Sequence, residues 1–349
     1  MLCIAAGTMT FFTERKFIMA NITILGCGFG TALAIMWNKY GHNVTAWSKY
    51  QEEIDAIRTD GEHKKLLPGV IVAPTIGLTT DLSCVEGADI LVFAIPSKFV
   101  REVAVKVKNH VSPNTVIVNV GKGFEEGTDK RLSEVISEEL PNNPVVVLTG
   151  PSHAEEIARN VPTTVVCASK ERKYTEYIQE TLQNERFRIY ANSDLIGCEL
   201  GGALKNPIAL CCGIVEGMGL GDNTIAALMT RGLAEITRLG VALGAKRETF
   251  NGLSGVGDLI VTCTSTHSRN HRAGLLIGEG IPAAEAVERV GTVEGYQCAK
   301  IVYDIATKLN VSVPIIEQLC AVCYCGQNPI ASIAKLMGRP SKAEEEIFN

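Results

Sequence analysis

The sequence lacks long runs of a single residue class. No uninterrupted apolar stretch approaches the roughly 20 residues that a membrane-crossing helix needs, so we expect a soluble protein without stable membrane insertion. A run of Lys and Arg is missing as well, and the net charge is −5, which argues against nucleic acid as the main partner. Small anionic ligands remain compatible with this charge where basic side chains converge.

The N-terminus lacks the order of a secretory signal. Apolar patches in the first 18 residues have no basic segment ahead of them, and Glu14, Arg15 and Lys16 follow instead. Met19 directly precedes the first convincing strand. We interpret residues 1–20 as an upstream start or loose extension, with a short strand or helix as the open alternative.

Paired cysteine motifs are also missing. The 12 cysteines are scattered, often inside apolar segments such as Cys211 and Cys212, as expected of small core residues in a reducing cytoplasm. The one cluster, Cys320, Cys323 and Cys325, has no second pair to complete four ligands. We therefore predict a cytoplasmic protein without a metal site.

Two histidines stand at helical spacing, but without the residue that a zinc protease requires. His267 and His271 are four positions apart, and no Glu follows the first of them. We interpret both as surface or ligand-adjacent side chains.

The first half of the chain alternates short β-branched runs with amphipathic stretches. A length of 349 residues with 46% hydrophobic and 20% charged residues allows two globular domains. Continuous apolar strands separated by helices predict a doubly wound, mostly parallel Rossmann-like sheet, with ligands outside the carboxyl ends of its strands. The expected strands are 21–25, 43–47, 89–94, 115–119, 145–149 and 163–168.

After about residue 190 the pattern becomes helical. We expect a dinucleotide-binding domain over 21–190 and an all-helical substrate domain over 191–349, with the boundary near Tyr190. The final segment, SKAEEEIFN, is typical of a solvated helix or frayed end. The expected helices are 194–217, 223–243, 271–279, 283–289, 296–308 and 315–323.

A glycine-rich turn follows the first expected strand. In ILGCGFGTALA, residues 24–34, Gly26, Gly28 and Gly30 spell Gly-x-Gly-x-Gly, one residue shorter than the dinucleotide fingerprint. The helix that follows still directs its free N–H groups at the turn, so we expect pyrophosphate binding to survive. Alone, the motif fits a packing turn equally well.

The second strand ends without the acidic residue that usually binds the ribose of NAD. Ser48 and Lys49 stand there instead, and they can accommodate a 2′-phosphate. A merely solvated Lys49 is equally compatible, so NADH and NADPH both remain open.

Three further loops follow expected strands and should line the same crevice. They are Ile95-Pro96-Ser97, Gly121-Lys122-Gly123 and Gly150-Pro151-Ser152. The two glycines beside Lys122 give its ammonium an uncrowded approach to a phosphate or a substrate oxygen.

The helical half adds a lysine in an apolar setting and a cluster of donors. Lys205 lies within ELGGALKNP, and a buried lysine is costly unless it has a partner or a task. Ser268, Arg269 and Asn270 together suit a phosphate monoester, because Arg can bind two oxygens at once.

Taken together, these motifs resemble the NAD(P)-dependent glycerol-3-phosphate dehydrogenases of the bacterial type, from about residue 21 to residue 342. ELGGALKN joined to GPSHAEE and the SRN stretch is the specific part, whereas the glycine-rich turn alone is not. The matching segments are GTALA (30–34), GKGFE (121–125), GPSHAEE (150–156), ELGGALKN (199–206), LSGVGDLIVTCTS (253–265), SRNHRAG (268–274) and TVEGYQCAK (292–300).

The resemblance implies a role for each matching residue. Lys205 resembles the catalytic lysine, Lys122 a second active-site lysine, and Asp258 and Thr262 their polar partners. The implied substrate contacts are Lys122, Gly150, Ser152, Lys205, Asn206, Asp258, Ser268, Arg269 and Asn270. The implied cofactor contacts are Gly26, Gly28, Phe29, Gly30, Lys49, Pro96, Lys122, Ala154, Arg269, Val293 and Glu294.

Two departures from the family pattern concern the coenzyme. Phe29 alone stands where the family has a Ser-Trp pair, and Ser48-Lys49 replaces a basic pair. The first affects contacts at the glycine-rich turn, and the second affects the choice between NADH and NADPH.

The implied reaction is reversible reduction of dihydroxyacetone phosphate to sn-glycerol 3-phosphate by NAD(P)H. Lys205 would act as general acid, with Lys122 lowering its pKa. The resemblance also implies a homodimer and a role in glycerophospholipid synthesis. Two alternatives remain: a related dehydrogenase for another hydroxy acid or keto alcohol, and a nucleotide-sensing or scaffolding protein without the chemistry.

Overall fold

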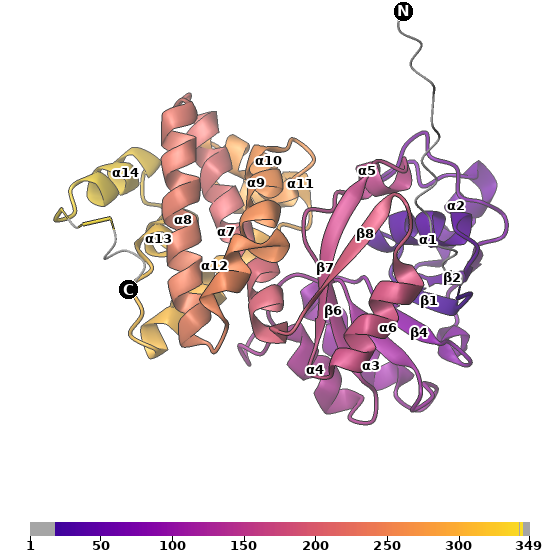
Figure 1. Ribbon diagram of the computed structural model, residues 1–349. Helices are drawn as coiled ribbons and strands as arrows, with labels where there is room; N and C mark the ends of the chain where they lie inside the picture. The colour runs from indigo at the N-terminus through magenta and orange to yellow at the C-terminus, as the bar shows by residue number, and fades with distance from the viewer. Residues whose placement is uncertain (1–17, 342, 345–349) are drawn as a thin grey trace, which may run out of the picture.

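The computed structural model describes residues 18–341, 343 and 344. The expectations for the N-terminal extension and for most of the polar tail concern residues outside this range. Figure 1 shows a sheet flanked by helices, formed by the first half of the chain, beside a region of helices only. We call these the sheet unit and the helical unit.

The strands of the sheet unit form one sheet in the order β3-β2-β1-β4-β5-β6-β7-β8. From β3 to β6 all neighbours are parallel, so their carboxyl ends share one edge. The strand order reverses between β1 and β4, where doubly wound sheets bind ligands. The strands are β1 (Asn21–Leu25), β2 (Asn43–Trp47), β3 (Gly77–Thr79), β4 (Ile90–Phe93), β5 (Val116–Asn119), β6 (Val145–Thr149), β7 (Thr163–Ser169) and β8 (Phe187–Asn192).

Apolar side chains cover both faces of this sheet, as the continuous apolar runs predicted. In β4, Ile90 and Val92 pack into the core that contains α1, whereas Leu91 and Phe93 pack into the core below α3 and α4. The helices of this unit are α1 (Phe29–Lys39), α2 (Gln51–Asp60), α3 (Val100–Val107), α4 (Leu132–Glu139), α5 (Ala154–Ala158) and α6 (Arg172–Leu182).

The expectation of parallel pairing is wrong for β7. It pairs antiparallel with β6, and β8 then pairs parallel with β7. The connection from β6 contains only the five-residue helix α5, which packs on α1, so the chain does not recross the sheet. Strands β3 and β8 were not predicted, and the predicted domain boundary near Tyr190 falls inside β8.

The helical unit follows directly after β8. Most of its helices coincide with expected ones, but α9 and α14 were not predicted, and a π-helical turn, Leu253–Gly257, leads into α9. The helices are α7 (Leu195–Gly217), α8 (Asp222–Ala242), α9 (Asp258–Thr264), α10 (Arg269–Gly278), α11 (Ala283–Val290), α12 (Glu294–Lys308), α13 (Pro314–Cys325) and α14 (Pro329–Met337).

Helix α7 forms the centre of the helical unit. Among the described residues it alone is long and apolar enough to cross a membrane by length and composition, yet its apolar stretch is buried inside the protein. Glu199, Lys205 and Asn206 interrupt the apolar sequence. In this structure α7 is therefore a core helix.

Glycines allow α7 and α10 to pack backbone against backbone. A Cβ on Gly213 would lie 2.1 Å from the His271 carbonyl oxygen, and one on Gly274 would lie 2.2 Å from the Leu210 carbonyl oxygen. The same close approach recurs one turn later at Gly217 and Gly278. This crossing fixes the N-terminus of α10 against the middle of α7.

A buried ion pair joins α7 to the sheet unit. Arg131, at the start of α4, donates to the Glu199 carboxylate at 2.8 Å. Ser133 donates to the same carboxylate through its N–H at 2.7 Å and its hydroxyl at 2.6 Å. Burial raises the pKa of Glu199, while these donors oppose that shift. Each polar group in this contact is thereby paired.

Candidate active site

Two lysines from different units meet on one carboxylate. Lys122, in the loop after β5, donates to Asp258 Oδ2 at 2.7 Å and to the Gly150 carbonyl oxygen at 3.1 Å. Lys205, on α7, donates to Asp258 Oδ1 and to Thr262 Oγ1, the latter at 2.5 Å. The structure thus brings together the four residues that were predicted to be catalytic.

Burial governs the protonation of Lys205. The residue is 5% exposed and Asp258 is 1% exposed. Loss of water lowers the pKa of Lys205 to about 7; the positive charge of Lys122 acts in the same direction, and Asp258 opposes both. Lys122 was predicted to lower this pKa, but burial is the larger cause.

Small residues on α7 make this close arrangement possible. A Cβ on Gly201 would lie 2.5 Å from the Ser254 carbonyl oxygen, in the π-helical turn before Asp258. A Cβ on Gly202 would lie 2.6 Å from Thr149 Oγ1, at the end of β6. Glycines at both positions therefore let the helix that carries Lys205 contact both the turn and the sheet.

A small pocket lies beside Lys122 and extends toward α1. Phe29 and Ser152, both predicted site residues, line it together with Thr149. The Thr149 hydroxyl is buried and has no hydrogen-bond partner among the described residues. An orphaned hydroxyl in a pocket that Lys122 also lines fits a polar ligand group, and Thr149 was not predicted from the sequence.

The glycine-rich turn has the geometry of an anion cradle despite its short length. Gly26 has φ +112°, and a Cβ there would lie 2.5 Å from the Ala94 carbonyl oxygen. Around Gly28 the nearest atom to such a Cβ is 3.9 Å away. Helix α1 then begins at Phe29 with no side-chain cap and no acidic residue in its first turn. Its free N–H groups fit a pyrophosphate.

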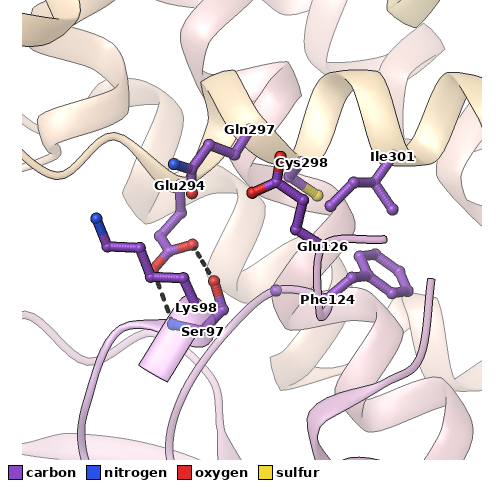
Figure 2. Close-up of a pocket in the computed structure, with 9 residues that line it drawn as sticks. Ser97, Lys98, Phe124, Glu126, Glu294, Gln297, Cys298 and Ile301 are labelled. Carbon is purple, nitrogen blue, oxygen red and sulfur yellow. Dashed lines mark hydrogen bonds between the residues drawn. The ribbon is translucent and has the colours of Figure 1, made fainter. Parts of the chain in front are cut away.

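A second contact between the units lies at the start of α12. Pro96 precedes Ser97, whose hydroxyl donates to Glu294 at 2.8 Å and whose N–H donates at 3.4 Å. Figure 2 shows Glu294 pointing from α12 onto Ser97, with Lys98 and Glu126 around the same pocket. Burial raises the pKa of Glu294. Val293, just before it, is buried.

Ser268 and Asn270 hold helices in place. Ser268 Oγ accepts from the His271 N–H at 3.2 Å and caps α10. Asn270 donates to Asn206 Oδ1 at 3.0 Å and accepts from the Gly295 N–H at 2.8 Å. Arg269 is exposed, and its guanidinium makes no hydrogen bond or ion pair within the described part of the chain. Among Ser268, Arg269 and Asn270, therefore, Arg269 is the residue whose side-chain N–H groups remain available to a ligand.

Family models for both halves match this chain. The model described as the N-terminus of NAD-dependent glycerol-3-phosphate dehydrogenase matches residues 21–175, and that described as its C-terminus matches residues 194–334. The chain belongs to this family. Membership confirms the predicted dehydrogenase class, its NAD(P) coenzyme and a phosphorylated small-molecule substrate.

Individual relatives agree over almost the whole length. A glycerol-3-phosphate dehydrogenase [NAD(P)+] from Desulfitobacterium hafniense is 50% identical over 330 residues, covering 94% of each chain. One from Clostridium acetobutylicum is 48% identical, covering 93% of this chain and 99% of its own. The crystal structure of the Coxiella burnetii enzyme superposes with TM-score 0.88 at 36% identity, covering 92% of this chain and 99% of its own.

The two histidines of this dehydrogenase do not share a helical face. His267 lies before α10, with its side chain 46% exposed. His271 is buried, and its Nε2 lies 3.0 Å from Glu216 Oε2. The surface interpretation of His271 is therefore wrong: the helix turns its ring inward beside α7.

Two predicted coenzyme contacts of the dehydrogenase lie at the rim of the sheet edge. Ala154 is the first residue of α5 and packs on the same core as Phe29. Lys49 follows β2 and places its ammonium 4.2 Å from the centre of the Phe99 ring. The roles of both residues in binding remain predictions.

Proposed function

We propose that this enzyme interconverts dihydroxyacetone phosphate and sn-glycerol 3-phosphate, with Lys205 as general acid and base. The observation that supports this most strongly is the shared contact of Lys122 and Lys205 with Asp258 at the carboxyl edge of the sheet. NADH or NADPH, when bound, would supply the hydride for C2 of the substrate.

The protein supplies the proton and the charge stabilisation. As the carbonyl oxygen gains negative charge, the Lys205 ammonium stabilises it and donates a proton; in the reverse direction the neutral amine accepts one. Asp258 orients both lysines, and Thr262, whose hydroxyl donates to the Asp258 carbonyl oxygen at 2.6 Å, accepts from Lys205. Lys122 adds a second positive charge beside the same oxygen.

The substrate phosphate is proposed to bind at the start of α10. Arg269 has free donors there, and two parallel N–H groups match two phosphate oxygens. Binding this remote group orients the reacting carbon toward Lys205. The other proposed substrate contacts are Gly150, Ser152, Asn206, Ser268 and Asn270.

The coenzyme is proposed to extend from the glycine-rich turn toward Lys122. The uncapped N-terminus of α1 supports pyrophosphate binding, and the pocket between Phe29 and Lys122 supports binding of a flat apolar ring with a polar substituent. In this proposal residues 21–190 bind the dinucleotide and 191–349 supply most substrate contacts. The remaining proposed coenzyme contacts are Lys49, Pro96, Ala154, Arg269, Val293 and Glu294.

Three broader features belong to the same proposal. We propose a cytoplasmic enzyme that supplies glycerol phosphate for phospholipid synthesis, in keeping with its family. A homodimer is supported by exposed apolar side chains on α14, where Ile330 is 68% and Met337 81% exposed. Light scattering coupled to size-exclusion chromatography measures that assembly.

The first experiment mixes the purified protein with dihydroxyacetone phosphate and follows oxidation of NADH and NADPH in parallel. We expect substrate-dependent loss of at least one reduced coenzyme and formation of glycerol 3-phosphate. Coenzyme that binds without turnover would contradict the proposal and favour the sensing alternative.

A further inference from the structure

A carboxylate that was not among the predicted site residues, that of Glu53, lies beside the end of β2. Ser48, directly after that strand, is 3% exposed, and its hydroxyl donates to Glu53 Oε2. The neighbouring residue Trp47 accepts from the Gly26 N–H at 2.7 Å, so Ser48 adjoins the glycine-rich turn. Glu53 lies in the first turn of α2, which brings its carboxylate back toward the strand end.

A buried histidine holds the same carboxylate from the other side. His63 is 6% exposed, and its Nε2 lies 3.2 Å from Glu53 Oε1. This hydrogen bond is the main reason that the pKa of Glu53 lies below its ordinary value, with Ser48 and the charge of Lys65 acting in the same direction. Glu53 is therefore ionised at neutral pH.

The charge of Glu53 reaches the glycine-rich turn. Burial and, secondarily, the negative charge of Glu53 raise the pKa of the Cys27 thiol to about 12. Cys27 stands between Gly26 and Gly28, so Glu53 lies near enough to the glycine-rich turn to act on a group within it. The adjacent cation, Lys49, has its ammonium over the Phe99 ring, at 4.2 Å from the ring centre, and over the Tyr50 ring, at 4.9 Å.

We propose that Glu53, positioned by Ser48 and His63, is the residue that makes this enzyme select NADH over NADPH. In Rossmann folds a carboxylate near the end of the second strand accepts from the ribose hydroxyls of NAD. Glu53 supplies that carboxylate from the following helix. The 2′-phosphate of NADPH would bring a second negative charge beside the Glu53 carboxylate. Repulsion between the two charges disfavours binding of NADPH. The inference rests on the proposed function only for where the coenzyme binds.

The test measures coenzyme binding without substrate. The purified full-length chain is titrated with NADH and with NADPH, and dissociation constants are taken from the change in coenzyme fluorescence. We expect the wild type to bind NADH at least about 10-fold more tightly than NADPH. Glu53→Gln should lower this ratio about 10-fold or more, mainly by tightening NADPH binding, because the amide keeps the shape and removes the charge.

A neighbouring residue provides the matched control. Glu52 lies on the same helix turn, is exposed and carries the same charge, so Glu52→Gln should leave the ratio unchanged. If both variants changed the ratio of the coenzyme affinities equally, Glu53 would act only as one surface charge among others, and the proposal would be overturned. If Glu53→Gln fails to fold, the ratio of the NADPH and NADH dissociation constants of the wild type still tests the proposal. Equal affinities for the two coenzymes, or tighter binding of NADPH, would overturn the selectivity.

Failure of the proposed function gives a different result. Tight and selective coenzyme binding without turnover of dihydroxyacetone phosphate would contradict the chemistry and leave the role of Glu53 supported. Turnover with equal use of both coenzymes would support the chemistry and refute the selectivity.

Discussion

Lys205 is enclosed by protein atoms, and this burial suits it to the proton transfer that we propose for it. A solvated lysine stays protonated far above neutral pH, whereas burial brings the pKa of Lys205 to about 7. An acid with a pKa near the working pH both donates and accepts protons readily.

Lys205→Ala should therefore remove most of the turnover and leave coenzyme binding intact. General acid catalysis contributes about 100- to 10,000-fold, so we expect a loss in that range. Steady-state rates and fluorescence titration with coenzyme measure the two effects. Near-normal turnover would remove Lys205 from the mechanism.

The two directions of the reaction should depend on pH in opposite ways. In the proposed mechanism reduction uses the protonated ammonium of Lys205, so its rate should fall as pH rises through about 7. Oxidation uses the neutral amine, so its rate should rise over the same range. Initial rates in both directions at saturating substrates test this. Parallel profiles would point to another titrating group.

The sequence indicates those candidate site residues whose context is unusual. Lys205 stands in an apolar run, and Lys122 stands between glycines after a strand. Glu53 gave no such signal, because it lies in the polar stretch Gln51–Asp55, which has the composition of a solvated helix face. Its neighbours Ser48 and His63 come from separate turns of the chain, and only the fold brings them together.

At the scale of elements, the contact between α7 and α10 depends on glycine. The two helices approach so closely at Gly213 and Gly274 that carbonyl oxygens fill the space of a side chain. Ser268 to Asn270, at the start of α10, take their position from this crossing.

Gly213→Ala should destabilise the protein. The added methyl group would lie 2.1 Å from the His271 carbonyl oxygen, so the helices must separate, at a cost of about 1–3 kcal/mol. Urea unfolding measures the change. Gly221→Ser is the control, because nothing lies within 4 Å of a Cβ there and Ser suits the N-cap of α8. Equal stability of the two variants would show that the crossing tolerates a side chain.

The strands show which elements a sequence can predict. Central strands such as β4 and β6 are continuous apolar runs, and their positions were predicted to within a residue. The missed strand β3 has three residues at the sheet edge, and β8 alternates buried and exposed residues at the other edge. The direction of β7 depends on how the chain packs after β6, which apolar periodicity does not encode.

At the scale of the whole molecule, a few polar contacts join the sheet unit to the helical unit. Arg131 with Glu199, Ser97 with Glu294 and Lys122 with Asp258 each cross from one unit to the other. The Glu199 carboxylate is buried in this junction and accepts from Arg131 and Ser133 together.

Arg131→Met should weaken this junction by about 3–5 kcal/mol, because it leaves a buried carboxylate without its cation. Arg172→Met removes a comparable cation from an exposed pair with Glu176, where we expect less than about 1 kcal/mol. Chemical denaturation of both variants gives the comparison. Similar small losses would mean that Ser133 alone satisfies the carboxylate.

Because two lysines share Asp258, the two halves of the gene depend on each other. One ammonium comes from the first half of the coding sequence, and the other, with the carboxylate, comes from the second half. A gene split between the halves would abolish the chemistry in both products, and co-expression would restore it only where the products reassociate in register. A chimera that takes one half of the gene from a relative must likewise preserve the contact between the two units. Substitutions in one half are therefore constrained by the sequence of the other half.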